Sequence, residues 1–173
     1  MATIDLAMTK IDLMSPPQSG LFWPQVTEAR RFFLGLPRPG KSGLVVGGGF
    51  ELVKSDYVVK RRGFAFLAME LVVGGYGSAT LNGRTFDLSP GTFFSYSPQI
   101  EHELRTDPRR PLVKYFVDIV GGKRAQSLLR SAKLSSDHAR HTSRVPELIR
   151  LFEELLNHGS SQTAQCRRSE EHT

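Results

Sequence analysis

Histidine and carboxylate side chains are the first candidates for chemistry in this chain, since such groups bind metal ions and exchange protons. His102 stands alone among them, because the other four histidines all lie beyond residue 137. Glu101 and Glu103 flank His102, and in a strand they point to the opposite face from it. Glu70 has no histidine nearby in the sequence. A metal ion needs three or four converging ligands, so we expect no metal site.

Nucleophilic catalysis also lacks its usual signature. The chain has no G-x-S-x-G motif, and its single cysteine, Cys166, lies in a polar C-terminal segment. We therefore expect no catalytic residues and no enzyme activity.

Short strands with tight turns dominate the middle of the chain. Asn82-Gly83 is a strong hairpin signal between residues 78–81 and 84–86. Ser89-Pro90-Gly91 predicts the next turn, before a strand at residues 92–96. Further strand patterns cover residues 44–53, with a bend or bulge at the triple glycine 47–49, and residues 57–59, 64–73, 100–105 and 112–120. Some eight short strands favour an antiparallel barrel or double sheet, while residues 27–34 fit either a strand or a helical turn.

Helical patterns follow the strands. We predict a short helix over residues 125–134, a polar loop over 135–143 and a stronger helix over 146–157, with Gly159 beyond its end. An apolar stripe runs along the second helix at Leu148, Ile149, Phe152, Leu155 and Leu156. This stripe could pack on the chain's own strands or pair with a second chain.

The composition is that of a globular protein with 173 residues, 39% of them hydrophobic and 23% charged. No apolar run approaches the roughly 18 residues that a membrane-spanning helix needs, and one cysteine suits a reducing compartment. We expect a cytoplasmic protein. The net charge of +6 resides mostly beyond residue 104, without a compact basic cluster.

Aromatic and a few polar residues are expected to line the interior of the barrel. They are Phe64, Phe66, Glu70, Phe93, Tyr96, His102 and Tyr115 or Phe116. A mainly apolar cavity with a few polar groups can hold a small ligand, but the same side chains could simply fill a core.

Residues 57–70, GYGSATLNGRTF, LSPGTFFSYSP with the following histidine, and PLVKYFVDIVG resemble the N-terminal regulatory domain of AraC-family transcription regulators. The resemblance covers roughly residues 22–158. It implies a mainly β fold, a cupin-like antiparallel β-barrel (double-stranded β-helix or jelly roll) followed by C-terminal α-helices. It also implies an N-terminal arm at 1–20, a sensing barrel at 21–122, a helical dimerisation segment at 123–158 and the start of a linker at 159–173.

The resemblance further implies a small-molecule effector, with a sugar as one candidate, bound in a metal-free barrel. Together with the interior pattern, it gives a set of expected ligand-binding residues: Lys60, Arg61, Phe66, Glu70, His102, Leu104, Lys114 and Phe116. It implies a homodimer through Leu148, Ile149, Phe152 and Leu155. DNA would be bound only through a helix-turn-helix region that this chain lacks.

Two alternatives remain at this stage. One is a small cupin enzyme, an isomerase or dioxygenase acting on a sugar or small acid. The other is an interaction barrel with a filled core.

Overall fold

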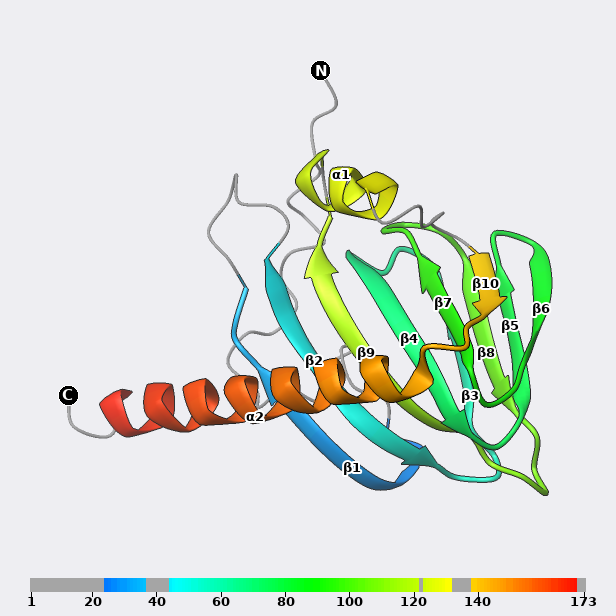
Figure 1. Ribbon diagram of the computed structural model, residues 1–173, viewed down its shortest axis with the longest axis horizontal. Helices are drawn as coiled ribbons and strands as arrows, with labels where there is room; N and C mark the ends of the chain where they lie inside the picture. Colours follow the sequence, from blue (N-terminus) through cyan, green and yellow to red (C-terminus); the bar gives the residue numbers. More distant parts are fainter. Residues whose placement is uncertain (1–23, 37–43, 122, 132–137, 171–173) are drawn as a thin grey trace.

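A computed structural model of the chain describes residues 24–36, 44–121, 123–131 and 138–170 (Figure 1). The expected N-terminal arm at residues 1–20 lies outside the described residues. The strands are β1 (Val26–Phe33), β2 (Val45–Val53), β3 (Val58–Arg61), β4 (Phe66–Gly74), β5 (Gly77–Leu81), β6 (Arg84–Leu88), β7 (Thr92–Tyr96), β8 (His102–Thr106), β9 (Val113–Val120) and β10 (His138–His141). The helices are α1 (Lys123–Ser131) and α2 (Val145–Glu170).

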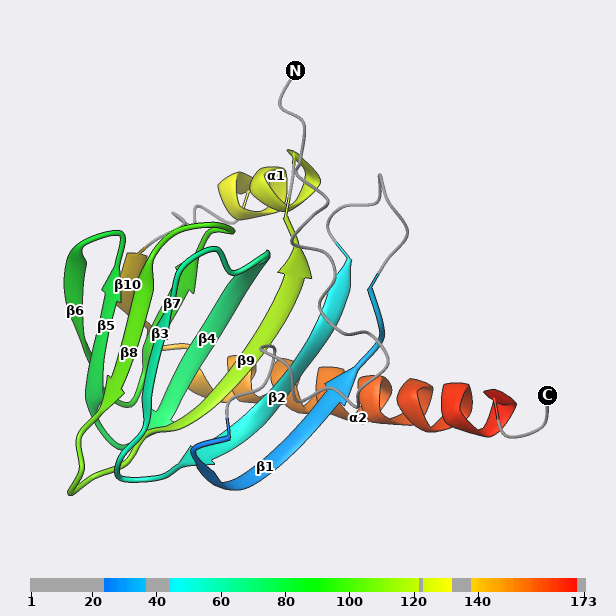
Figure 2. The same cartoon turned by 180° about the vertical axis from the view of Figure 1, so that it is seen from behind.

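Two antiparallel sheets make up the body of the molecule. The first has the order β1-β2-β9-β4-β7-β10 and the second has the order β3-β8-β5-β6. They face each other, as Figures 1 and 2 show from opposite sides. No ladder of hydrogen bonds joins the two sheets in the described residues, so the double-sheet expectation is confirmed while the sheet is not closed into a barrel.

The hairpin predictions are confirmed by the backbone. Asn82 and Gly83 both have positive φ, at 48° and 79°, and join β5 to β6. Gly91 has a φ of 91° in the turn before β7, where the amide of Thr92 donates to the carbonyl of Ser89. These turns set the register that places every second side chain of each strand between the sheets.

Between the sheets lies the main hydrophobic core. It contains Val53, Tyr57, Val59, Phe64, Ala68, Val72, Ala79, Leu81, Leu88, Phe94, Tyr96, Leu104 and Leu112. The opposite face of the six-stranded sheet carries a second core, where Phe32, Leu71, Tyr115 and Val117 pack against Phe152 and Leu156 of α2. Helix α2 crosses this outer face, and its C-terminal turns extend past β1 (Figure 1).

Two local predictions are wrong. Residues 138–141 lie in the strand β10, paired with β7, and not in a loop. Helix α2 also continues through Gly159 to Glu170. Gly159 lies within the helix, where the lack of a side chain lets α2 approach β1. A Cβ at this position would overlap the ring of Phe32, and three ring atoms would lie within 2.7 Å of it. The open assignment of residues 27–34 resolves as the strand β1.

Candidate functional site

Strand β9 supplies one side of a cavity between the two sheets. Its residues Lys114, Phe116 and Asp118 alternate along the strand and therefore share one face. Hydrogen-bonded registers place Glu51 of β2 opposite Lys114, and Glu70 of β4 opposite Phe116. The order β2-β9-β4 thus brings four charged residues from three distant segments into one buried place.

The cavity is small and mostly polar. Its lining consists of Glu51, Tyr57, Val59, Arg61, Phe64, Glu70, Tyr96, Leu104, Lys114, Phe116 and Asp118. The space that the centre of a water molecule can reach is about 30 Å³, which is room for a water or two. A larger occupant requires the surrounding side chains to move.

Lys114 is the electrostatic centre of the cavity. Its side chain is 4% exposed, and its Nζ lies 3.1 Å from Glu51 Oε2 and 2.8 Å from Glu70 Oε2. Burial alone lowers the pKa of Lys114, but the two carboxylates outweigh it and hold this pKa well above its ordinary value. Lys114 is therefore a cation in a buried setting, where charges interact strongly.

The two glutamates are held by further partners. Arg31 of β1 donates from Nη2 to Glu51 Oε1 at 2.6 Å, and the hydroxyl of Tyr96 donates to Glu70 Oε1 at 2.9 Å. Burial by itself raises the pKa of Glu51, but the charges of Lys114 and Arg31 reverse this effect and lower it. Both carboxylates thus have fixed orientations, and Glu51 stays ionised at neutral pH.

Asp118 behaves differently from its neighbours. Burial, and then the charge of Glu70, raise the pKa of Asp118 well above its ordinary value. A neutral Asp118 can donate as well as accept a hydrogen bond. The cavity therefore presents cationic donors and carboxyl groups together, enclosed by aromatic rings.

The structure brings most of the expected ligand-binding residues together. Arg61, Glu70, Leu104, Lys114 and Phe116 all line the cavity. Lys60 does not line the cavity, because it precedes Arg61 in β3 and therefore points to the opposite face of the strand. Its side chain is 60% exposed, and its Nζ lies 3.3 Å from Glu103 Oε2.

His102 and Phe66 lie just behind the lining. His102 is 1% exposed, stacks on Tyr96 at a ring distance of 4.2 Å, and lies 5.9 Å from the ring of Phe64. Neither of its ring nitrogens makes a well-formed hydrogen bond to a described residue. Burial, and then the charge of Arg61, lower the pKa of His102 to about 4. Phe66 packs edge-on against Phe64 at 5.4 Å.

Sequence reasoning missed Glu51, Tyr57, Val59 and Asp118 as members of this site. The signal for two of them was present in the sequence: Glu51 is the single charged residue of β2, and Asp118 stands between apolar residues in β9. Such residues in a buried strand need a partner inside the protein. The partners of Glu51, however, are Arg31 and Lys114, which lie on other strands.

The expected dimer residues pack within the chain. Phe152 is 8% exposed and its ring stacks on that of Tyr115 at 5.4 Å. Leu148, Ile149 and Leu155 are partly buried against the same outer core. The apolar stripe of α2 therefore covers the chain's own sheet, the first of the two interpretations left open by the sequence.

Among the described residues, no group of three or more His, Cys, Asp or Glu side chains is placed to hold a metal ion. No helix in the described ranges is long and apolar enough to cross a membrane.

Comparisons with solved structures give distant similarities. The plu4264 protein from Photorhabdus luminescens is 15% identical, with a TM-score of 0.44 over 64% of this chain and 88% of that chain. A cupin domain of an XRE-family transcriptional regulator from Enterobacter cloacae is 13% identical, with a TM-score of 0.39 over 44% and 82%. A salicylate 1,2-dioxygenase from Pseudaminobacter salicylatoxidans is 14% identical, with a TM-score of 0.38 over 56% and 24%.

Sequence comparison is more specific. No curated protein sequence matches the chain significantly. The sequence profile of the AraC-like ligand binding domain, in contrast, matches residues 49–171, a range that includes Glu51, Arg61, Glu70, Lys114 and Asp118 of the cavity and the whole of α2. Because this profile matches most of the chain, the chain belongs to the family of AraC-like ligand-binding domains.

Proposed function

We propose that this domain senses a small polar effector in the cavity between its sheets and thereby regulates transcription. The observation that carries this proposal is the buried cluster of Lys114, Glu51, Glu70 and Asp118 around a cavity. Buried charges are costly, and replacing them with apolar residues often preserves or increases stability. Their concentration at one cavity fits recognition of a ligand better than it fits maintenance of the fold.

A sugar or a similar neutral molecule with several hydroxyl groups suits this lining. Lys114 and Arg61 would donate hydrogen bonds, Glu70 and Glu51 would accept them, and the ring of Phe116 offers an apolar face. Because the cavity now has room for only a water or two, the effector must displace water and spread the lining. Lys60 lies on the other face of its strand and is left out of the proposed site.

Thermal-shift screening against sugars and small polar metabolites tests this function. A molecule that binds the native state raises the melting temperature by mass action. The matched variants are Lys114→Met, which alters the cavity, and Lys60→Met, which removes a lysine from the outside. A true effector stabilises the wild type and Lys60→Met but not Lys114→Met. An unchanged shift in Lys114→Met would place binding elsewhere.

The competing function is that of a small cupin enzyme acting on a sugar or small acid. Metal analysis of the purified protein separates the two, since cupin enzymes of this kind use a bound metal. Stoichiometric iron, manganese, nickel or zinc in the purified chain would contradict the sensor proposal. The membership in the AraC-like family favours the sensor.

We further propose that the domain acts as a homodimer linked to a helix-turn-helix region, with residues 123–158 and the rest of α2 forming the connection. Since the apolar stripe of α2 is used within the chain, the contact would involve the outer side of this helix. Leu151 is a large hydrophobic residue on that side, with 51% of its surface exposed. Leu151→Glu is expected to give a folded monomer in size-exclusion chromatography with light scattering; a folded dimer would refute this interface.

A further inference from the structure

Glu153 occupies an unusual position on helix α2. It lies next to Phe152 on the side of the helix that faces the sheet. Arg30 of β1 donates to both of its carboxylate oxygens, at 2.9 Å and 2.5 Å, and the hydroxyl of Tyr115 donates to Oε1 at 2.5 Å. A single carboxylate on α2 is thus bound by two strands of the sheet.

The same two strands hold the cavity. Arg31, the residue after Arg30, binds Glu51 on the inner face, and Lys114, the residue before Tyr115, binds Glu51 and Glu70. Neighbouring residues of a strand point to opposite faces, and their Cα atoms are about 3.8 Å apart. The two cations that bind Glu51 are therefore covalent neighbours of the two donors that bind Glu153.

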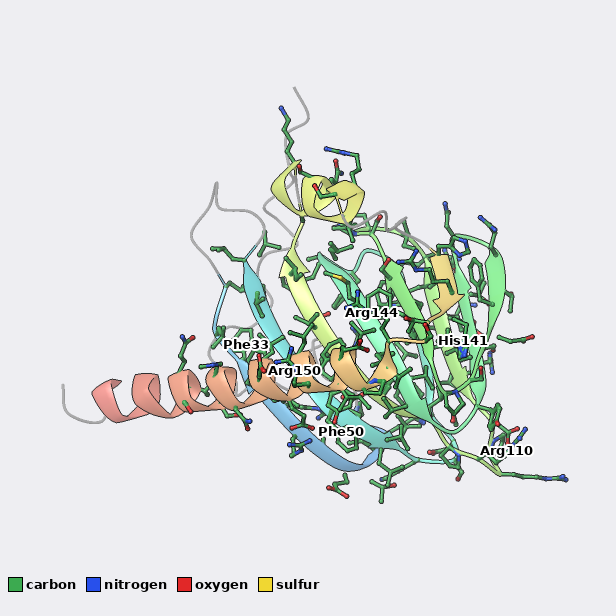
Figure 3. All side chains as sticks on the ribbon, in the orientation of Figure 1. Phe33, Phe50, Arg110, His141, Arg144 and Arg150 are labelled. Carbon is green, nitrogen blue, oxygen red and sulfur yellow. The ribbon has the colours of Figure 1, made fainter. Side chains whose placement is uncertain are left out.

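The outer contacts are sensitive to small movements. The Arg30 contact is a bidentate guanidinium–carboxylate pair, which depends on the relative orientation of two planar groups. Hydrogen bonds weaken steeply when their angles degrade. Phe50, labelled in Figure 3 beneath α2, packs against both donors. Its ring lies 5.0 Å from that of Tyr115 and 5.3 Å from the guanidinium carbon of Arg30.

We propose that Glu153 couples the occupancy of the cavity to the seating of α2 on the sheet. An occupant that draws Lys114 or Glu51 into new hydrogen bonds shifts β9 or β1 and misaligns Tyr115 or Arg30, which loosens α2. As a mode of regulation this rests on the proposed function, because the effector is the source of the movement. The coupling between the two faces exists without it and can be measured without a ligand.

A double-mutant cycle tests the coupling in the full chain. Glu51→Gln perturbs the cavity, where Glu51 binds Arg31 and Lys114. Glu153→Gln perturbs the outer contact, where Glu153 binds Arg30 and Tyr115. Independent sites multiply their effects on the unfolding constant to within about twofold. We expect the combined effect to deviate from the product by fivefold or more, as measured by urea unfolding.

Glu154 provides the matched control. It is the next residue of α2, and it pairs with Arg150 on the same helix rather than with the sheet. Glu51→Gln combined with Glu154→Gln should be multiplicative within about twofold. A multiplicative cycle for Glu153 as well, or equal deviations for both positions, would overturn the proposal.

Hydrogen exchange distinguishes coupling from a merely structural role. Glu51→Gln should speed the exchange of amides in residues 148–157 of α2 in the wild-type background, but not once Glu153→Gln is present. If Glu153→Gln does not fold, Tyr115→Phe is used in its place. Tyr115→Phe removes the hydroxyl that donates to Glu153 and keeps the aromatic ring. Unchanged α2 exchange on Glu51→Gln would refute the coupling, whereas failure of the effector screen alone would refute only the proposed function.

Discussion

Replacement of Lys114 by methionine is the sharpest test of the buried charge cluster. Methionine keeps the length and apolar stem of lysine but leaves Glu51 and Glu70 without the cation that lies 3.1 Å and 2.8 Å away. Removing one partner of a buried ion pair typically costs about 3–5 kcal/mol. The two carboxylates retain Arg31 and the Tyr96 hydroxyl, so we expect the lower end, about 3 kcal/mol.

Urea unfolding at several pH values measures this loss. With a slope of about 2 kcal/mol/M, the midpoint at pH 7 should fall by about 1.5 M. The pH dependence has a definite sign. Loss of Lys114 removes the largest effect that lowers the pKa of Glu51 and leaves burial, which raises this pKa, opposed by Arg31 alone. Protonation of Glu51 at lower pH therefore relieves part of the loss. The deficit relative to wild type should therefore shrink from pH 7 toward pH 4.5.

Lys60→Met is the control for this experiment. Lys60 is mostly exposed and pairs with Glu103 at the surface, and exposed ion pairs contribute little. Its variant should unfold like the wild type within error at every pH. Equal losses in the two variants, or a Lys114→Met deficit that does not change with pH, would show that the cluster is not the tightly coupled buried site described above.

Three further predictions follow from single positions. Gly159→Ala should lower the free energy of unfolding by about 1–2 kcal/mol, measured with urea, because overlap of the new methyl group with Phe32 outweighs the roughly 1 kcal/mol gain in helix propensity. A stabilised variant would contradict that contact. Adding Phe32→Leu to Gly159→Ala should recover the loss. His102 has a pKa of about 4, below its unfolded value, so the wild type should lose about 3 kcal/mol of stability as pH falls from 7 to 4, and His102→Leu should lose less; parallel pH profiles would refute this. Asp118 has a raised pKa, so the native state of the wild type loses stability as pH rises. The melting temperature of Asp118→Asn minus that of the wild type should therefore be larger at pH 7.5 than at pH 5; the same difference at both pH values would indicate that Asp118 is already ionised at pH 5.

Local signals in the sequence were strong enough to predict the strands and turns of the core. Asn82-Gly83 favours a hairpin because both residues accept positive φ, and the structure has that hairpin. The apolar stripe of α2 likewise predicted a helix with one buried face, but the sequence could not identify the surface that covers it. Gly159 was misread for a related reason: a glycine that ends a helix and one that admits a neighbouring ring look alike until the neighbour is known.

The sequence by itself determined the mainly antiparallel β body, the helix that follows it and the resemblance to AraC-like regulatory domains, because periodicity, turn residues and motif order are local properties of the chain. Only the tertiary structure decided which charged residues meet. Strand register, a long-range property, places Lys114 between Glu51 and Glu70 and turns Arg61 inward while Lys60 faces out. A shift of one residue in those pairings would exchange the two faces, and with them the cavity and the contacts to α2.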